Sequence, residues 1–189
     1  MLNRIRNLKR RTKIILVSLI AILIWFWFCL PAKLFNAPTS FILEDRNGKL
    51  LDASIAADGQ WRFPYDDSVP DKFIQCILTF EDKRFYHHIG VDPLAFGRAV
   101  LKNIKGNGPT QGGSTITMQV IRLSRDKQQR NLWQKLIESV MAVRLECSYS
   151  KKAIMALYAS NAPFGGNVVG LDAAAWRYYG TSPYKIELG

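Results

Sequence analysis

The sequence predicts a mainly α-helical body with a small N-terminal β-element, preceded by one transmembrane helix. Three observations carry this prediction: an uncharged apolar run near the N-terminus, an Asn-Gly turn between two short β-prone segments, and helical spacing of apolar residues from Val69 onward. With 189 residues, the chain is long enough for one domain with a packed core and an appendage.

The apolar run covers residues 14–30 and contains no charged side chain. As a helix it spans roughly 26 Å, close to the thickness of the hydrocarbon layer. A cleaved signal peptide is the alternative, but the aromatic cluster at 25–28 lacks the small residues of a cleavage site and is typical of a membrane interface. The basic residues of segment 1–13 therefore predict a cytoplasmic N-terminus, with everything after Pro31 on the outer side of the membrane.

The net charge is +11, of which +6 comes from residues 1–13. The rest of the chain carries 20 cations against 15 anions, or +5. This distribution indicates an anionic membrane surface or a phosphorylated substrate rather than a nucleic acid. The three cysteines, Cys29, Cys76 and Cys147, lack the spacing of a metal site, and we expect them to be buried free thiols.

Residues 31–68 are expected to form a linker and the β-element. A hairpin around Asn47-Gly48 is predicted at 41–51, and Asp58-Gly59 offers a second turn. The domain that follows, residues 69–189, has helical periodicity. We expect its helices at 70–78, 93–105, 114–124, 132–145, 151–160 and 173–179, with a glycine-rich loop at 106–113.

The segment most typical of a site is 81–90, which holds two carboxylates and both histidines of the chain. An acid at a helix C-terminus opposes the helix dipole, which makes Glu81 a candidate for catalysis, although an ordinary helix end is the alternative. Because His87 and His88 are adjacent, they cannot both face one point, and a metal site is disfavoured. A histidine whose hydrogen bond holds the loop is the better interpretation.

Two further segments are candidates for binding. Residues 112–119 combine glycines, hydroxyls and a helix start, which favours phosphate binding but also describes an ordinary helix cap. Lys135 and Glu138 share one helix face, either as a functional pair or as a surface ion pair. The acyl-transfer pattern Ser-x-x-Lys occurs three times without its companion motifs, so we assign none of the three to catalysis.

Taken together, these residues resemble the peptidoglycan glycosyltransferase domain, glycosyltransferase family 51, of class A penicillin-binding proteins. The first family motif is matched by Glu81, Asp82, Phe85, His88 and Gly90. The second is matched from Gly112 to Gln119, and the third at 134–138 with Gln134 in place of its arginine. Later signatures match from Lys151 through Tyr158 to Asn161 and at 174–180.

Three details are most similar to the penicillin-binding protein 1C branch: segment 58–62, Met118 and segment 162–166. The resemblance implies a lysozyme-like glycosyltransferase lobe with an apolar jaw that dips into the membrane, formed by loop 106–113 and the residues up to about 130. It also implies a C-terminally incomplete domain without the family's transpeptidase domain, because the chain stops at Gly189.

By this resemblance the chain polymerises lipid II, an undecaprenyl-pyrophosphate-linked disaccharide-pentapeptide, into glycan strands. Glu81 would be the general base and Glu138 the second catalytic carboxylate, the latter orienting nearby cations or helping a divalent metal ion (Mg or Mn) to bind the substrate pyrophosphate. Lys135 and Arg122 would stabilise the departing pyrophosphate. The full set expected to bind substrate or frame it is Asp82, Phe85, His88, Ser114, Thr115, Gln119, Arg122 and Lys135.

The expected partners are lipid II, the growing glycan strand and the membrane, with other cell-wall synthesis proteins as further candidates and no nucleic acid. Two other functions stay open at this point. One is a catalytically impaired fragment that binds lipid II or acts as a scaffold. The other is a membrane-anchored, lysozyme-like glycan hydrolase, which would place two carboxylates on either side of the scissile bond.

Overall fold

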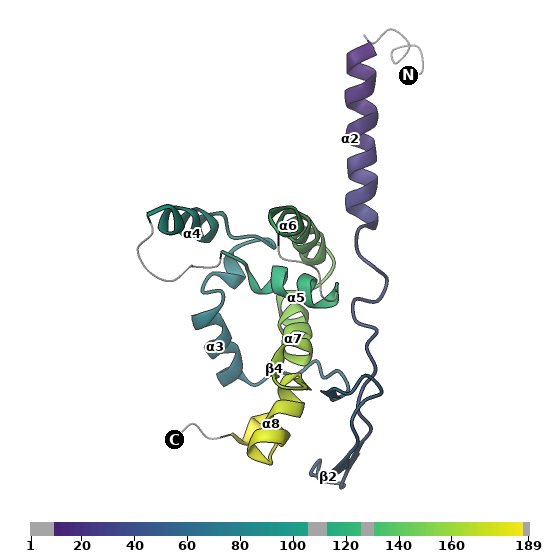
Figure 1. Cartoon of the computed structure of the whole chain (residues 1–189), viewed down its shortest axis with the longest axis vertical. Coiled ribbons are helices and arrows are strands. Elements are labelled where there is room, and N and C mark those ends of the chain that lie inside the picture. The colour runs from purple at the N-terminus through teal and green to yellow at the C-terminus, as the bar shows by residue number, and fades with distance from the viewer. Residues whose placement is uncertain (1–9, 106–112, 126–130, 187–189) are drawn as a thin grey trace.

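The computed structural model describes residues 10–105, 113–125 and 131–186. The predicted mainly α-helical class is confirmed (Figure 1). The helices are α2 (Arg10–Phe28), α3 (Asp71–Phe80), α4 (Pro93–Lys105), α5 (Ile116–Ser124), α6 (Leu132–Glu146), α7 (Lys151–Asn161) and α8 (Leu171–Tyr179), with short 3-10 turns η1 (Phe85–His87) and η2 (Pro183–Lys185). The strands are β1 (Ile42–Glu44), β2 (Leu50–Ala53), β3 (Trp61–Arg62), β4 (Pro163–Gly165) and β5 (Val168–Val169).

Helix α2 projects from the lobe, and none of its residues is buried (Figure 1). Its length and composition are sufficient to cross a membrane. It begins at Arg10, four residues before the predicted segment, and ends at Phe28, two residues before the predicted end. The helix stops early because Cys29 and Leu30 turn onto the lobe and pack against its core.

The predicted hairpin is confirmed as an antiparallel pair of β1 and β2, with Leu43 opposite Asp52. The Asp45 carboxylate accepts hydrogen bonds from the backbone N–H groups of Asn47 (2.7 Å) and Lys49 (2.9 Å). Gly48 has a φ of 71°, in the left-handed region that glycine adopts without a steric penalty. Local turn chemistry therefore closes this hairpin.

A second, three-stranded sheet was not predicted. Strand β3 pairs in parallel with β5, and β5 pairs antiparallel with β4. This sheet joins the N-terminal β-element to the part of the chain that follows α7. Strands of two or three residues are too short to show a period of two in the sequence, which explains why the pattern did not indicate them.

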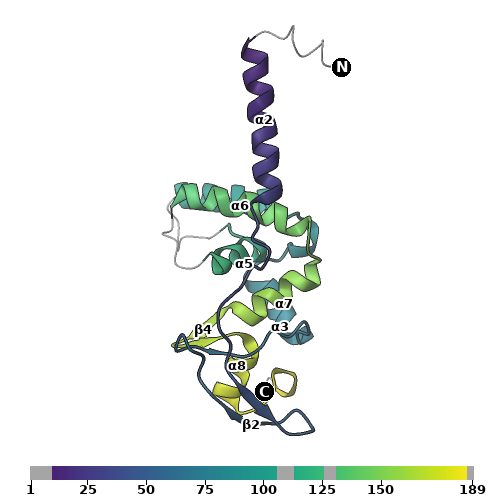
Figure 2. The same cartoon turned by 90° about the vertical axis from the view of Figure 1, so that its right-hand side faces the viewer.

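The core lies where α5 is enclosed by α6 and α7. Five of the nine residues of α5 are buried, so this helix is covered on most of its faces. Its apolar side chains pack with those of the two neighbouring helices and with a residue from η1; the set is Ile116, Met118, Val120, Ile121, Met141, Ala142, Leu145, Ile154, Met155 and Phe85. Helix α6 lies across the anchor end of the lobe, and α5 lies below it (Figure 2).

The expectation of buried thiols is wrong for two of the three cysteines. Cys76 and Cys147 are exposed, and Cys29 is half-buried; all three are free. Cys76 lies on a different face of α3 from Phe73 and Ile77, which pack against the core. Cys147 is the C-cap residue of α6 and follows Leu145, the last buried residue of that helix.

Candidate functional site

A cavity of about 440 Å³ opens between the end of α3, the start of α4 and the first half of α5. Its lining is mostly polar and combines carboxylates with several cations. The charged and hydrogen-bonding residues of the lining include Glu81, Asp82, Lys83, Arg84, Asp92, Arg98, Ser114, Thr115, Gln119 and Arg122. We call this space the Glu81 chamber.

Glu81 is the cap residue at the C-terminus of α3, where its backbone N–H donates to the Ile77 carbonyl at 2.8 Å. Its side chain is exposed to the chamber and accepts a 2.8 Å hydrogen bond from Nε2 of Gln119 on α5. Tyr158 lies behind the pair: burial, and to a smaller extent the Glu81 charge, raise the pKa of Tyr158. The carboxylate is thus oriented by α5 while it stays open to a ligand.

Asp82, the next residue, is 7% exposed and also borders the chamber. Its carboxylate is 2.9 Å and 3.1 Å from Nε2 of His88, and it accepts a 3.1 Å hydrogen bond from the Ile116 backbone N–H. These contacts attach loop 81–90 to the N-terminus of α5, where a negative charge is favourable. Asp82 therefore fixes the segment from which Glu81 projects.

The first turn of α5 is attached to the same loop at a second point. Thr115 caps α5 by accepting from the Met118 backbone N–H at 3.2 Å, and its hydroxyl donates to the Gly90 carbonyl at 2.6 Å. Gly90 has a φ of 76°, and a Cβ atom there would lie 2.5 Å from the backbone nitrogen of Val143 on α6. The loop thus requires glycine at this position because it packs directly on the α6 backbone.

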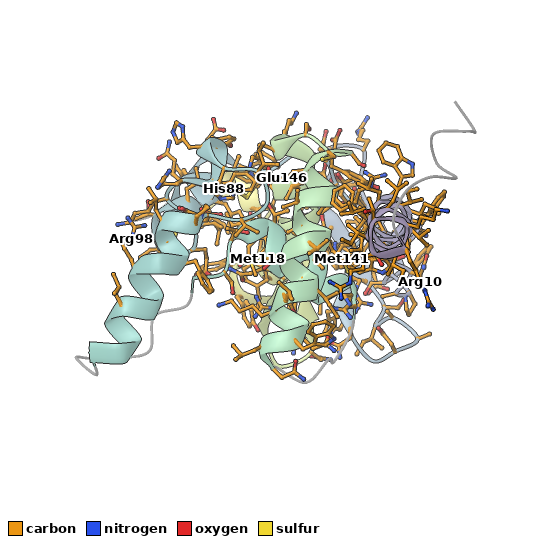
Figure 3. The ribbon with its side chains drawn as sticks, turned by 90° about the horizontal axis from the view of Figure 1, so that it is seen from above. Arg10, His88, Arg98, Met118, Met141 and Glu146 are labelled. Carbon is orange, nitrogen blue, oxygen red and sulfur yellow. The ribbon has the colours of Figure 1, made fainter. Side chains whose placement is uncertain are left out.

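A buried polar cluster behind the loop was missed by the sequence reasoning. Glu146 accepts hydrogen bonds from Thr117 Oγ1 (2.6 Å) and Lys151 Nζ (2.7 Å), and its Oε1 lies 4.0 Å from Nδ1 of His88. Lys151 also donates to the His88 carbonyl at 2.8 Å, and its Nζ lies 4.4 Å from the Phe85 ring centroid. Figure 3 shows His88 and Glu146 next to each other.

The sequence offered one weak signal for Glu146, which is an acid that directly follows the apolar stripe of helix 132–145. Phe85 and His88 do not line the Glu81 chamber. The Phe85 ring is fully buried and packs edge-on against His88, so the position of these two residues supports a framing role rather than direct contact with substrate.

A second cavity, of about 690 Å³, lies beside the N-terminal half of α6. It contains the predicted pair Lys135 and Glu138, and we call it the Glu138 chamber. Its lining residues are Ser114, Arg122, Asn131, Leu132, Trp133, Gln134, Lys135 and Glu138. Since Ser114 and Arg122 line both chambers, the two spaces adjoin along α5.

Glu138 is 7% exposed, yet within the described parts of the chain it makes no hydrogen bond or ion pair. Lys135 lies with its Nζ 5.2 Å from the Phe96 ring centroid on α4 rather than against Glu138. The interpretation of the two as a surface ion pair is therefore not supported. An almost buried carboxylate without a partner is costly unless a ligand or a cation completes its surroundings.

Gln134, which stands at the arginine position of the third motif, also faces the Glu138 chamber. Its backbone N–H is held by the Asn131 side chain at 2.7 Å, which caps α6. Its Oε1 is buried and has no hydrogen-bond partner among the described residues. Most of the glycine-rich loop 106–113 and residues 126–130, which we assigned to the apolar jaw, lie outside the described residues.

The described residues contain no group of three or more His, Cys, Asp or Glu side chains that could hold a metal ion. In the Glu138 chamber the lining provides one carboxylate. A magnesium ion there would need oxygens from a bound substrate and from water for most of its ligands, as is usual for magnesium bound with phosphates.

The profile of the transglycosylase family matches residues 48–189. Penicillin-binding protein 1C of Escherichia coli is 34% identical over 158 residues, which cover 83% of this chain and 20% of that relative. Penicillin-binding protein 1A of Aquifex aeolicus is 35% identical over 65% of this chain, and penicillin-binding protein 1A/1B of Bacillus subtilis is 34% identical over 78%. The chain spans about a fifth or less of the length of these relatives.

Proposed function

The chain belongs to the transglycosylase family, and on this premise we propose that it is a peptidoglycan glycosyltransferase. It polymerises lipid II into glycan strands and releases undecaprenyl pyrophosphate. The observation that carries the proposal is the position of Glu81: an exposed carboxylate, oriented at 2.8 Å by Gln119, in a chamber lined by cations.

Glu81 acts as the general base. It takes the proton from the 4-hydroxyl of the acceptor sugar as that oxygen attacks the anomeric carbon of the donor, and the bond from this carbon to the pyrophosphate breaks. A base must lie within hydrogen-bonding reach of the proton that it removes, which requires an exposed carboxylate of fixed direction. Gln119 supplies that direction from α5, and Asp82 holds the loop that carries Glu81.

The departing pyrophosphate takes up negative charge, and cations placed in advance stabilise it. Arg122 lines both chambers and lies between the base and the second carboxylate. Lys135 adds a second cation in the Glu138 chamber, and Ser114 adds a hydroxyl at the junction. A divalent ion bound to the pyrophosphate would be held by Glu138 and would supply further positive charge.

The substrate tail requires contact with a membrane, and the exposed apolar residues of the lobe fit this requirement. Helices α4 and α6 lie at the anchor end of the lobe (Figures 1 and 2). They carry large exposed apolar side chains, namely Leu94, Phe96, Leu101, Leu132, Trp133 and Leu136. With α2 crossing the inner membrane and its basic end in the cytoplasm, the lobe would lie on the outer face and extract lipid II from it.

The hydrolase alternative has less support because, among the described residues, the other carboxylates that line the Glu81 chamber are already bonded within the protein. Asp82 is bonded to His88 and to α5. Asp92 accepts from the backbone N–H groups of Leu94 and Ala95 and lies 3.6 Å from Arg84. Burial opposes ionisation of Asp92, but these contacts outweigh it and lower its pKa, so the side chain serves as the cap of α4 rather than as an acid.

Glu81→Gln tests the proposal. Since general-base catalysis contributes about 10²–10⁴-fold, strand synthesis from lipid II in liposomes should fall by at least about 100-fold while the thermal unfolding curve is unchanged. Glu44→Gln, on the exposed hairpin, is the matched control and should retain full turnover. Normal synthesis by Glu81→Gln would refute the assignment.

The same assay addresses the two other functions. Absence of turnover by the unchanged chain, together with cooperative unfolding and lipid II binding, would identify a binding or scaffolding fragment. Release of muropeptides from mature peptidoglycan without consumption of lipid II would identify a hydrolase.

A further inference from the structure

Among the described residues, one side chain at the membrane end of the lobe donates a hydrogen bond to the backbone of the anchor helix α2. Arg144, in the last turn of α6, donates from Nε to the Trp27 carbonyl at 3.2 Å. Its guanidinium carbon also lies 4.6 Å from the centroid of the Trp27 ring, and it donates to the Ser148 hydroxyl. The two contacts to Trp27 join residues 117 positions apart in the sequence.

The contact lies at the C-terminal end of α2, and this position explains why it is favourable. The last four carbonyls of a helix have no partner within the helix, and α2 ends at Phe28. Carbonyls inside the hydrocarbon layer have no water to bond to, so a donor from the protein is favourable for those near its boundary. The guanidinium supplies that donor together with a positive charge, which is favourable at the negative end of the helix dipole.

The contact links the anchor to the helix that carries the Glu138 chamber. Helix α6 lies transverse to α2 at its lower end, and Figure 3 looks along α2 onto α6. Lys135 and Glu138 lie toward the other end of α6. The chain that leaves the membrane adds to the same attachment, because Leu30 and Leu34 pack on the core beneath α6.

A tilt of α6 around Arg144 would displace the residues toward the other end of that helix. Lys135 is nine residues before Arg144, about 14 Å along the helix axis. A tilt of about 20° around Arg144 would move Lys135 by about 5 Å, whereas displacements of about 1 Å at reacting groups are already costly for catalysis. Without a fixed angle between α2 and α6, the chamber would not stay at the level of the lipid phosphates.

We propose that Arg144 is a positioning residue: by capping the anchor helix, it fixes the depth and tilt of α6 in the membrane interface and so aligns Lys135 and Glu138 with the pyrophosphate of membrane-bound substrate. The docking of α2 on α6 stands on the geometry alone. Its consequence for the reaction rests on the proposed function.

The test uses the full 189-residue chain in vesicles of phosphatidylethanolamine and phosphatidylglycerol. The depth of Trp133 is measured by bromolipid quenching, as the difference between each protein and its Trp133→Phe counterpart. Arg144→Ala should reduce the Trp133 quenching about twofold and lower lipid II turnover in vesicles about tenfold, mainly through kcat. In detergent micelles, which adapt their shape to the protein, its turnover should stay within about twofold of the unchanged chain.

Arg177→Ala is the matched control because Arg177 also lies over a tryptophan, with its guanidinium carbon 5.8 Å from the Trp61 ring centroid, but on α8 away from the anchor. It should leave quenching and vesicle turnover unchanged. Arg144→Lys, which can still donate to the Trp27 carbonyl, should recover at least half of the quenching.

The proposal is overturned if Arg144→Ala matches Arg177→Ala in both Trp133 quenching and vesicle turnover. It is also overturned if turnover falls equally in vesicles and micelles, since that result indicates general damage. If Arg144→Ala no longer unfolds cooperatively, Arg144→Gln replaces it under the same criteria. Should the chain be inactive in every lipid, the proposed function fails, while the quenching experiment still decides the docking.

Discussion

The two chambers are built in opposite ways. Around Glu81, the carboxylate and the residues that frame it are bonded to one another: Asp82 to His88, Thr115 to Gly90, and Gln119 to Glu81 itself. Around Glu138, an almost buried carboxylate has no hydrogen bond or ion pair within the described residues, and the Gln134 amide oxygen is buried without a partner there.

The difference indicates that one chamber is organised before the substrate arrives and the other is completed by it. A base that must take a proton in one direction benefits from a rigid setting. Under the proposed function, groups that hold a pyrophosphate would gain their partners only when that ligand binds. Substitution of the residues that frame Glu81 should therefore lower stability, whereas substitution of Glu138 should lower activity without lowering stability.

The largest effect is expected for Asp82→Asn. This change removes the negative charge beside His88 and weakens the bond to the N-terminus of α5, both in a buried place. Loss of a buried hydrogen bond made by a charged group costs about 1.5–3 kcal/mol of the free energy of unfolding, and strand synthesis should be lost with it. Urea unfolding measures the change, with the exposed Asp67→Asn as control. A variant as stable as the control would contradict the view that Asp82 fixes the loop.

Glu138→Gln should have the opposite profile. Lipid II turnover should fall about 100-fold, about 2.7 kcal/mol of transition-state stabilisation, because the chamber loses its one lining carboxylate. The free energy of unfolding should stay equal or rise slightly, since a buried charge without a partner is removed. Steady-state kinetics and urea unfolding are measured on the same samples. A loss of stability as large as that of Asp82→Asn would end the contrast between the chambers.

The smallest effect concerns Asp172, an acid in the first turn of α8 that lines neither chamber. Burial, with the nearby charge of Asp66, raises the pKa of Asp172 to about 6. Because the folded form holds this proton more tightly than the unfolded form, its contribution to stability is present below about pH 4 and is lost as the pH rises through about 6.

Asp172→Asn should remove this pH dependence. The variant should be about 1 kcal/mol more stable than the unchanged chain at pH 7.5 and equal to it at pH 4, a magnitude reduced for partial exposure to solvent. Thermal unfolding across this pH range provides the measurement, with lipid II turnover expected to stay constant. A stability gain that is the same at both pH values would show that the carboxyl group does not titrate as stated.

Much of the fold could be predicted because its signals are local. The uncharged run identified the anchor, Asn47-Gly48 identified the hairpin, and apolar spacing placed the helices to within a few residues of their observed ends. Candidate site residues were also found locally, since Glu81 follows a helix and Ser114 precedes one. What the spacing could not show was their division into two chambers joined at Ser114 and Arg122.

The sequence by itself therefore determined the helices, the β1–β2 hairpin and the apolar segment of α2, and it named the candidate site residues. Only the tertiary structure decided which of them meet: Glu146 with Lys151 and His88, β3 with β5, and Arg144 with the end of the anchor helix. The physical reason is that turns, caps and periodicity depend on neighbours a few positions away. These contacts instead depend on how whole helices and strands pack, and one of them joins residues 117 positions apart.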